Sequence, residues 1–329
     1  MKKKKILVTG AGGFIGSNLV ERLVKKNFNV TALVQYNVDN DYGWLDNVKF
    51  KKNKPKIVTG DICDSIFVDK ICKNIDYVIH LAALISIPYS YRSPLSYIHT
   101  NILGTTNLLD SCRKNKIKHF IQTSTSEVYG SAKYVPIDEN HPLNAQSPYA
   151  ASKIAADQIC LSFHKSFNLP VTILRPFNTF GPRQSLRAVI PTILYQATKK
   201  NTIKLGNINS KRDFTFIDDT VKAFILALNR KKTIGEVINL GTGYEFSIKD
   251  VLKSTSEILN KKINVIKKKE RLRPKKSEVN RLLSNNKKAK KILKWKPKYV
   301  GKKGFKEAIK ITLKWVQKQK KGKENLYND

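Results

Sequence analysis

Residues 5–19, KILVTGAGGFIGSNL, contain an apolar run, a glycine-rich turn and the beginning of a helical pattern. The apolar run predicts a buried strand, and the apolar spacing that continues through residue 24 predicts an amphipathic helix. Glycine at the turn allows a tight bend and lets the backbone approach a pyrophosphate, whose charge the helix N-terminus stabilises. This order of strand, turn and helix predicts a dinucleotide site. Its predicted contacts are Gly10, Gly13, Phe14, Ile15 and Gly16.

The same rhythm of apolar run and helical segment continues to about residue 175. It predicts an α/β fold with a doubly wound parallel sheet that carries helices on both faces. After residue 176 the pattern becomes irregular, with more Pro, Gly and charge, which indicates a smaller C-terminal substrate domain. The predicted division is therefore 1–175 for the coenzyme domain, 176–316 mainly for the substrate domain with about 215–245 returning to the first domain, and 317–329 for a flexible Lys-rich tail.

The charge of the chain is strongly positive, +37 from 62 Lys and Arg against 25 Asp and Glu. The lysines are scattered through all segments and form no stripe interleaved with aromatic residues, which argues against a nucleic-acid interface. A field of this sign attracts an anionic diphosphate. We therefore expect a solvated basic surface and no nucleic-acid partner.

The four cysteines stand far apart, in no C-x-x-C pair and with no histidine at metal-ligand spacing. They predict reduced thiols and no metal site. The apolar stretch after MKKKK is interrupted after Val8, and no run of 18 apolar residues occurs. These observations predict a cytoplasmic protein with no membrane partner.

Coenzyme choice depends on the end of the second predicted strand, where an acidic residue would bind the ribose hydroxyls of NAD. Gln35 stands there, with neither that carboxylate nor an arginine for a 2′-phosphate. The sequence therefore leaves NAD and NADP open, with NAD the preferred coenzyme. Asp61 follows the third strand, where it could accept a hydrogen bond from the adenine amine or cap a helix.

A tyrosine and a lysine four residues apart, Tyr149 and Lys153 in SPYAASK, share one face of a predicted helix. A nearby ammonium favours phenolate and should lower the pKa of Tyr149. A tyrosine tuned in this way could remove a proton from a sugar hydroxyl. The pair follows the predicted strand that ends in Thr123-Ser124-Thr125.

Several motifs resemble, in order and spacing, those of the extended short-chain dehydrogenase/reductase family. They are GAGGFIG, GDICD, HLAA, NILGT, STSEVYG, YAASK, RPFNTFGPR, RDFTFIDD, INLGTG and RPKKSEV, and they cover nearly the whole chain. The resemblance implies a Rossmann-type domain followed by a small nucleotide-sugar domain. It also implies a homodimer formed through two helices, about residues 95–114 and 148–166, and further coenzyme contacts. These are Ile62, Leu81, Ala82, Ala83, Tyr149 and Lys153.

Within that family, the residues after the serine-threonine strand distinguish the reactions. Thr125-Ser126-Glu127 resembles the threonine-serine-glutamate form of sugar 4,6-dehydratases, in which the carboxylate removes the C5 proton. By the same resemblance, Thr125 bonds the 4-oxygen and Ser126 helps at the leaving hydroxyl. Epimerases usually carry small residues in place of Glu127, and UDP-glucuronate decarboxylases share STSEVYG. The alternatives are therefore a 4-epimerase and a decarboxylase, and in another class a non-catalytic sensor or a basic nucleic-acid binder.

The segments ALVQYN, DYGWLD and RLRPKKSEVNRLL look most like the LegB-type N-acetylglucosamine nucleotide 4,6-dehydratases of legionaminic acid pathways. The resemblance implies a UDP- or GDP-N-acetylglucosamine-like substrate. Guanidinium groups suit its diphosphate because they offer paired donors. The expected substrate contacts are Asn178, Arg183, Arg212 and Arg273.

Overall fold

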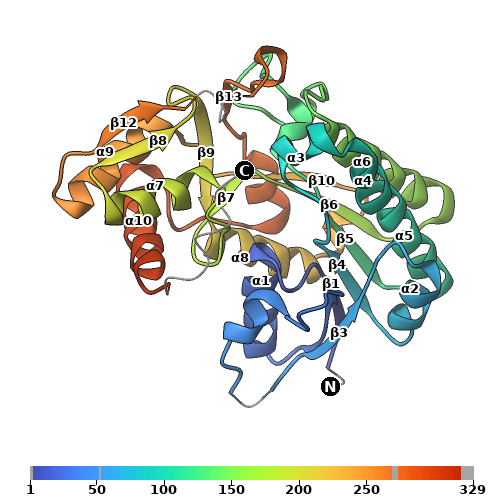
Figure 1. Ribbon diagram of the computed structural model, residues 1–329. Helices are drawn as coiled ribbons and strands as arrows, with labels where there is room; N and C mark the ends of the chain where they lie inside the picture. Colours follow the sequence, from blue (N-terminus) through green and yellow to red (C-terminus); the bar gives the residue numbers. More distant parts are fainter. Residues whose placement is uncertain (1–2, 52, 269–272, 320–329) are drawn as a thin grey trace.

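The computed structural model describes residues 3–51, 53–268 and 273–319 of the chain (Figure 1). Its centre is a seven-stranded, entirely parallel sheet in the order β10-β6-β5-β4-β1-β2-β3. Successive strands run outward from β1 in both directions, which is the doubly wound arrangement predicted from the sequence. The strands are β1 Lys5–Thr9, β2 Asn29–Gln35, β3 Lys56–Gly60, β4 Tyr77–His80, β5 His119–Thr123, β6 Val171–Pro176 and β10 Val237–Leu240.

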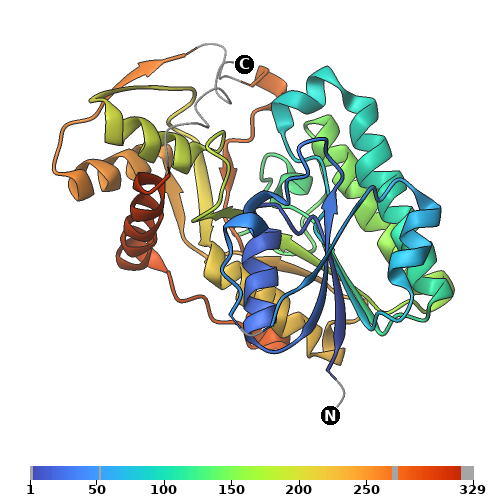
Figure 2. The same cartoon turned by 60° about the horizontal axis from the view of Figure 1, so that its bottom comes forward.

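Helices cover both faces of this sheet (Figures 1 and 2). Apart from the edge strand β3, the strands are largely buried between the helix layers, as expected for a parallel sheet with near-continuous apolar runs. One layer contains α2 Ser65–Cys72, α5 Gly104–Lys114 and α6 Pro148–Phe167, and the other contains α1 Phe14–Lys25 and α8 Ile217–Leu228.

The predicted helix at about residues 95–114 has three parts: α4 Pro94–Tyr97, a π-helical turn at Ile98–Leu103, and α5. Short α3, Ile87–Arg92, precedes it. Helix α6 begins where the sequence indicates, because the Ser147 side chain caps the Ala150 N–H and Pro148 occupies the first turn.

A second group of elements lies beside the sheet, to the left in Figure 1. Strand β9 pairs with β7, β11 and β13, and β8 pairs with β12. Between β9 and β11 the chain returns to the first group of elements, where α8 packs against α1 and β10 joins the large sheet. The remaining strands are β7 Asn178–Phe180, β8 Thr202–Leu205, β9 Lys211–Phe216, β11 Glu245–Ser247, β12 Asn264–Lys267 and β13 Arg281–Leu282; the helices are α7 Val189–Lys199, α9 Ile248–Leu259 and α10 Gly301–Gln317.

Helix α10 packs against the second group and also reaches the first, where Trp315 makes an edge-on contact with Trp44 at 5.2 Å between ring centroids. Of the tail predicted at 317–329, Gln317 ends the helix, and residues 320–329 lie outside the described residues. No helix in the described ranges combines the length and apolarity needed to cross a bilayer.

Candidate functional site

Gly10, Gly13 and Gly16, three of the four glycines in GAGGFIG, have different structural roles. Gly10 has φ +64°, and a Cβ there would lie 2.7 Å from the Ala82 nitrogen; a Cβ on Gly16 would lie 2.1 Å from the Gly10 oxygen. Both positions therefore require glycine for the turn itself. A Cβ on Gly13 would meet only the Gly10 oxygen, at 3.2 Å, so this glycine leaves the approach to α1 open.

The beginning of α1 suits a pyrophosphate. Gly13 is the N-cap, and no described side chain caps the helix there. First-turn N–H groups and the positive end of the helix dipole are thus available to an anion, beside Phe14 and Ile15. This open glycine surface at an uncapped helix start fits the predicted dinucleotide.

A buried hydrogen-bond network holds the end of β4 against the glycine turn. Thr9 Oγ1 accepts from the Leu81 and Ala82 N–H groups, both at 3.1 Å. His80 joins Thr9 at 2.7 Å and Thr105 at 3.0 Å. Burial, aided by the charge of Lys153, lowers the pKa of His80 to about 3, so the ring is neutral. The segment from Leu81 to Ala83 is therefore held at the edge of the coenzyme turn.

The two polar residues proposed near the adenosine differ in their surroundings. Gln35 is exposed at the end of β2. Asp61 Oδ1 accepts from the Cys63 N–H at 2.8 Å, which stabilises its own turn, next to buried Ile62. The helix-cap role considered for Asp61 is wrong, because the α2 N-cap is Asp64, which accepts from two first-turn N–H groups.

Tyr149 and Lys153 lie on α6 and are both buried. The Lys153 ammonium donates to the Thr123 carbonyl at 2.6 Å, and Tyr149 shares a side-chain hydrogen bond with Thr125. The predicted lowering of the Tyr149 pKa is wrong for the protein alone. Burial raises that pKa well above its ordinary value, and the Thr125 bond opposes the rise only in part. The physical reason is that desolvation disfavours phenolate more strongly than the neighbouring groups stabilise it.

The segment after β5 forms a 3₁₀ turn, Ser126–Tyr129, whose N-cap is Thr125. Thr125 Oγ1 accepts from the Glu127 N–H at 3.2 Å, and Ser126 is buried. The carboxylate of Glu127 also raises the Tyr149 pKa, so the two groups interact electrostatically. The turn therefore places a hydroxyl and a carboxylate close to the tyrosine.

Two of the four predicted substrate residues are near Glu127. Arg273 Nη1 forms an ion pair with Glu127 Oε2 at 3.4 Å. Arg212 is buried on β9, where its guanidinium donates to the Val279 carbonyl at 2.6 Å and interacts with the charge of Glu127. The arrangement joins one carboxylate and two guanidinium groups from segments far apart in sequence.

Asn178 and Arg183 differ from that pair. Asn178 Oδ1 is buried and has no hydrogen-bond partner among the described residues, which leaves an acceptor for a ligand. Arg183 instead pairs with Glu21 on α1, and the Glu21 carboxylate also pairs with Lys25. Arg183 is thus not grouped with Arg212 and Arg273 by any described contact.

Ser277 lies four residues after Arg273, in the RPKKSEV motif, and links this segment to two other parts of the chain. The Ser277 hydroxyl bonds Tyr91 of α3 and the Gln146 carbonyl. The Gln146 amide in turn donates to the Lys276 carbonyl at 2.7 Å. This segment ties the second group of elements to the helices beside Tyr149. The motif RPKKSEV marks the segment in the sequence, but no spacing in the chain indicates that Tyr91 and Gln146 are the partners of Ser277.

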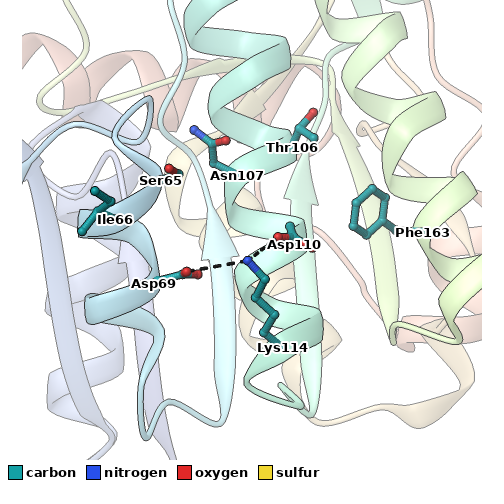
Figure 3. A pocket seen from close by; sticks show the side chains of 8 residues that line it. All are labelled: Ser65, Ile66, Asp69, Thr106, Asn107, Asp110, Lys114 and Phe163. Atoms are coloured by element: carbon teal, nitrogen blue, oxygen red, sulfur yellow. Dashed lines mark ion pairs between the residues drawn. The ribbon is translucent and has the colours of Figure 1, made fainter.

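A separate cavity of about 320 Å³ lies between α2, α5 and α6 (Figure 3). Lys114 within it pairs with Asp110 at 2.8 Å and with Asp69 at 3.7 Å. None of the predicted site residues lines it, and the charge of its one lysine is already balanced by the two aspartates. We therefore assign it no role in the reaction.

Comparison with known proteins identifies the relatives of this arrangement. The family model described as GDP-mannose 4,6 dehydratase matches residues 7–308. A dTDP-D-glucose 4,6-dehydratase of Dictyostelium discoideum is 39% identical over 78% of this chain, which spans 62% of that relative's length. A putative UDP-glucose 4-epimerase of Methanocaldococcus jannaschii is 34% identical over 95% of this chain and 98% of its own.

A solved UDP-glucuronic acid 4-epimerase from Bacillus cereus, in complex with UDP-glucuronic acid and NAD, superimposes with a TM-score of 0.84. It is 29% identical and covers 95% of this chain and 99% of its own. Dehydratases and epimerases thus both occur among the relatives.

Proposed function

Because this chain belongs to the extended short-chain dehydrogenase/reductase family of NAD-dependent epimerases and dehydratases, we propose that it is a nucleotide-sugar 4,6-dehydratase. The observation that carries this choice is the position of Glu127. Its carboxylate is largely buried, with a 12% exposed side chain, and it interacts with Tyr149. A 4-epimerase needs no such base, whereas elimination across C5 and C6 requires one.

In this proposal Tyr149 removes the proton of the sugar 4-hydroxyl while Thr125 bonds the 4-oxygen. Lys153 binds the coenzyme ribose and, as an ammonium, favours phenolate at Tyr149. A bound oxidised nicotinamide would supply the hydride acceptor and a further positive charge, which compensates for the raised pKa of Tyr149 in the protein alone. The coenzyme contacts are those predicted from Gly10 to Gly16, Gln35, Asp61, Ile62 and Leu81 to Ala83.

Once C4 is a ketone, the proton on C5 becomes acidic and Glu127 accepts it. Ser126 assists as water leaves from C6. Arg273 forms an ion pair with the Glu127 carboxylate at 3.4 Å, which holds this side chain at the turn before the sugar binds. Each proton transfer is thus assigned to a side chain of this turn or of α6.

The substrate is proposed to be a UDP- or GDP-N-acetylglucosamine-like sugar. Arg212, Arg273 and Asn178 are its diphosphate and nucleotide contacts, while Arg183 contributes only after release from Glu21. NAD is the proposed coenzyme, since Gln35 offers no cation for a 2′-phosphate. The protein is proposed to act as a homodimer through α4–α5 and α6, where Leu95, Ile98 and Leu103 are exposed apolar residues.

Isotope labelling distinguishes this dehydratase from an epimerase. Deuterium placed on C4 of the sugar should appear on C6 of the product, and solvent deuterium should enter at C5. Glu127→Gln keeps the shape but cannot accept the C5 proton, so elimination should slow by about 10² to 10⁴-fold and a 4-keto sugar should accumulate. Mass spectrometry and NMR of the product provide the measurement.

An epimerase would return the label to C4 and lose little activity in Glu127→Gln. Label recovered at C4, without solvent exchange at C5, would therefore reject the dehydratase mechanism.

A further inference from the structure

A fully buried carboxylate, Asp157, lies one helical turn after Lys153 on α6. Its Oδ2 atom accepts three hydrogen bonds: from Ser124 Oγ at 2.7 Å, and from Arg175 Nε at 3.1 Å and Nη2 at 3.0 Å. An oxygen that accepts three donors, two of them on a guanidinium, is the oxygen of an ionised carboxylate. Neither the family motifs nor the proposed reaction assigns Asp157 a role.

The partners of Asp157 link it to the reactive turn. Ser124 follows β5 directly and precedes Thr125, so the bond to Asp157 anchors the backbone that leads into the Thr125–Glu127 turn. Arg175, near the end of β6, also donates to the Tyr129 hydroxyl at 2.9 Å. Tyr129 is the last residue of the 3₁₀ turn Ser126–Tyr129, which contains Glu127. Asp157 and Arg175 therefore hold both ends of the segment that carries Glu127.

The same carboxylate acts on Lys153 by charge. Helical spacing of four residues places the two side chains on one face of α6. Burial lowers the pKa of Lys153, and the charge of Asp157 is the largest opposing cause. A buried ammonium needs an anion nearby to remain protonated. Among the described residues, those whose charge or titration bears on this cluster are Tyr149, Lys153 and Cys160 of α6, Arg175 of β6, Glu127 and Tyr129 of the turn, His80 of β4, and Glu139.

We propose that Asp157 is a positioning residue with two tasks: it anchors the Thr125–Glu127 turn through Ser124, and it is the buried counter-ion of Lys153. The inference rests on the roles given to Tyr149 and Lys153 in the proposed function. Both a dehydratase and an epimerase would use those roles, so it does not depend on the choice between them.

The test measures pH profiles in variants that remove or keep the charge at position 157. Asp157→Asn removes a negative charge, which lowers the pKa of Lys153 and of Tyr149. Both limbs of the profile should therefore move to lower pH, by about one unit or more. Asp157→Glu keeps the charge, so its profile should stay in place. Ser124→Ala removes a hydrogen bond but no charge, so its rate should fall while its profile stays in place.

Two readouts are needed. The first is the rate at which the NAD-bound enzyme converts a nucleotide sugar, followed by NMR of the sugar. The second is NAD affinity across pH without any sugar, whose alkaline limit should move in the same direction because Lys153 holds the ribose. If no nucleotide sugar is converted, the proposed function fails, and the second readout still tests Asp157.

A profile of Asp157→Asn that coincides with that of the unmodified protein would overturn the counter-ion role, as would equal shifts in Asp157→Asn and Asp157→Glu. An unchanged rate in Ser124→Ala would overturn the anchoring role. If Asp157→Asn does not fold, Asp157→Ser takes its place, with the same expected shift and the same overturning result.

Discussion

The proposed coenzyme region and the proposed substrate region of this protein are built in different ways. The glycine turn is completed within residues 10–16, and its contacts come from the adjacent end of β4. The substrate region combines Glu127, Arg212 and Arg273, which three distant segments supply. A local turn is determined by backbone sterics, whereas the charge cluster depends on how two parts of the chain pack. We therefore expect mutations in the first region to abolish NAD binding, and mutations in the second region to change the KM for the nucleotide sugar gradually.

The largest effect is expected in the glycine turn. Gly13→Leu should fold, because its Cβ would contact only the Gly10 oxygen, and that atom needs to move by a few tenths of an ångström. The side chain would then occupy the space required by the pyrophosphate, and NAD binding should be lost. Titration calorimetry measures the affinity, and circular dichroism checks the fold.

Gly16→Leu is the matched control. Its Cβ would lie 2.1 Å from the Gly10 oxygen, so the turn itself cannot form and the thermal midpoint should fall sharply. Unchanged NAD affinity in folded Gly13→Leu would contradict the coenzyme assignment.

The next effect concerns Tyr149, where the two regions meet. Tyr149→Phe removes the hydroxyl that acts on the sugar and should lower turnover by about 10²-fold or more. The dissociation constant of the nucleotide sugar should scarcely change, since the arginine contacts lie elsewhere. Steady-state kinetics and equilibrium binding measure the two quantities. A variant that retains more than about a tenth of the rate would exclude Tyr149 as the general base.

A smaller effect is expected in the substrate region, where Arg273 and Arg183 form a matched pair. Arg273→Met should raise KM for the nucleotide sugar by about tenfold or more, because a charged hydrogen bond contributes about 1.5–3 kcal/mol. Arg183→Met should change KM by about fivefold at most, since that arginine pairs with Glu21 on α1 and has no described contact with Glu127 or the other two arginines. Equal changes in both variants would show that Arg183 also binds the substrate. Such a result would remove the distinction drawn between the two arginines.

Fold class, and the glycine turn that is proposed as the coenzyme site, could be predicted from sequence because their signals are local. A buried parallel strand appears as a short apolar run, and a turn that requires glycine shows glycine. The Tyr149 and Lys153 pair is local too, since helix geometry alone places residues four apart on one face. Asp157 also stands at helical spacing, four residues after Lys153, but the positioning role proposed for it depends on Arg175, which lies on β6.

Sequence by itself determined the doubly wound α/β fold, the glycine turn and the residues of the reactive turn, because sterics and helix periodicity act over a few residues. Tertiary structure alone decided that Arg273 pairs with Glu127, that Arg183 pairs with Glu21, and that burial raises the pKa of Tyr149. Each of these depends on which distant groups exclude water from a charge or offer it a partner. Desolvation and pairing are properties of packed surroundings, and no spacing along the chain encodes them.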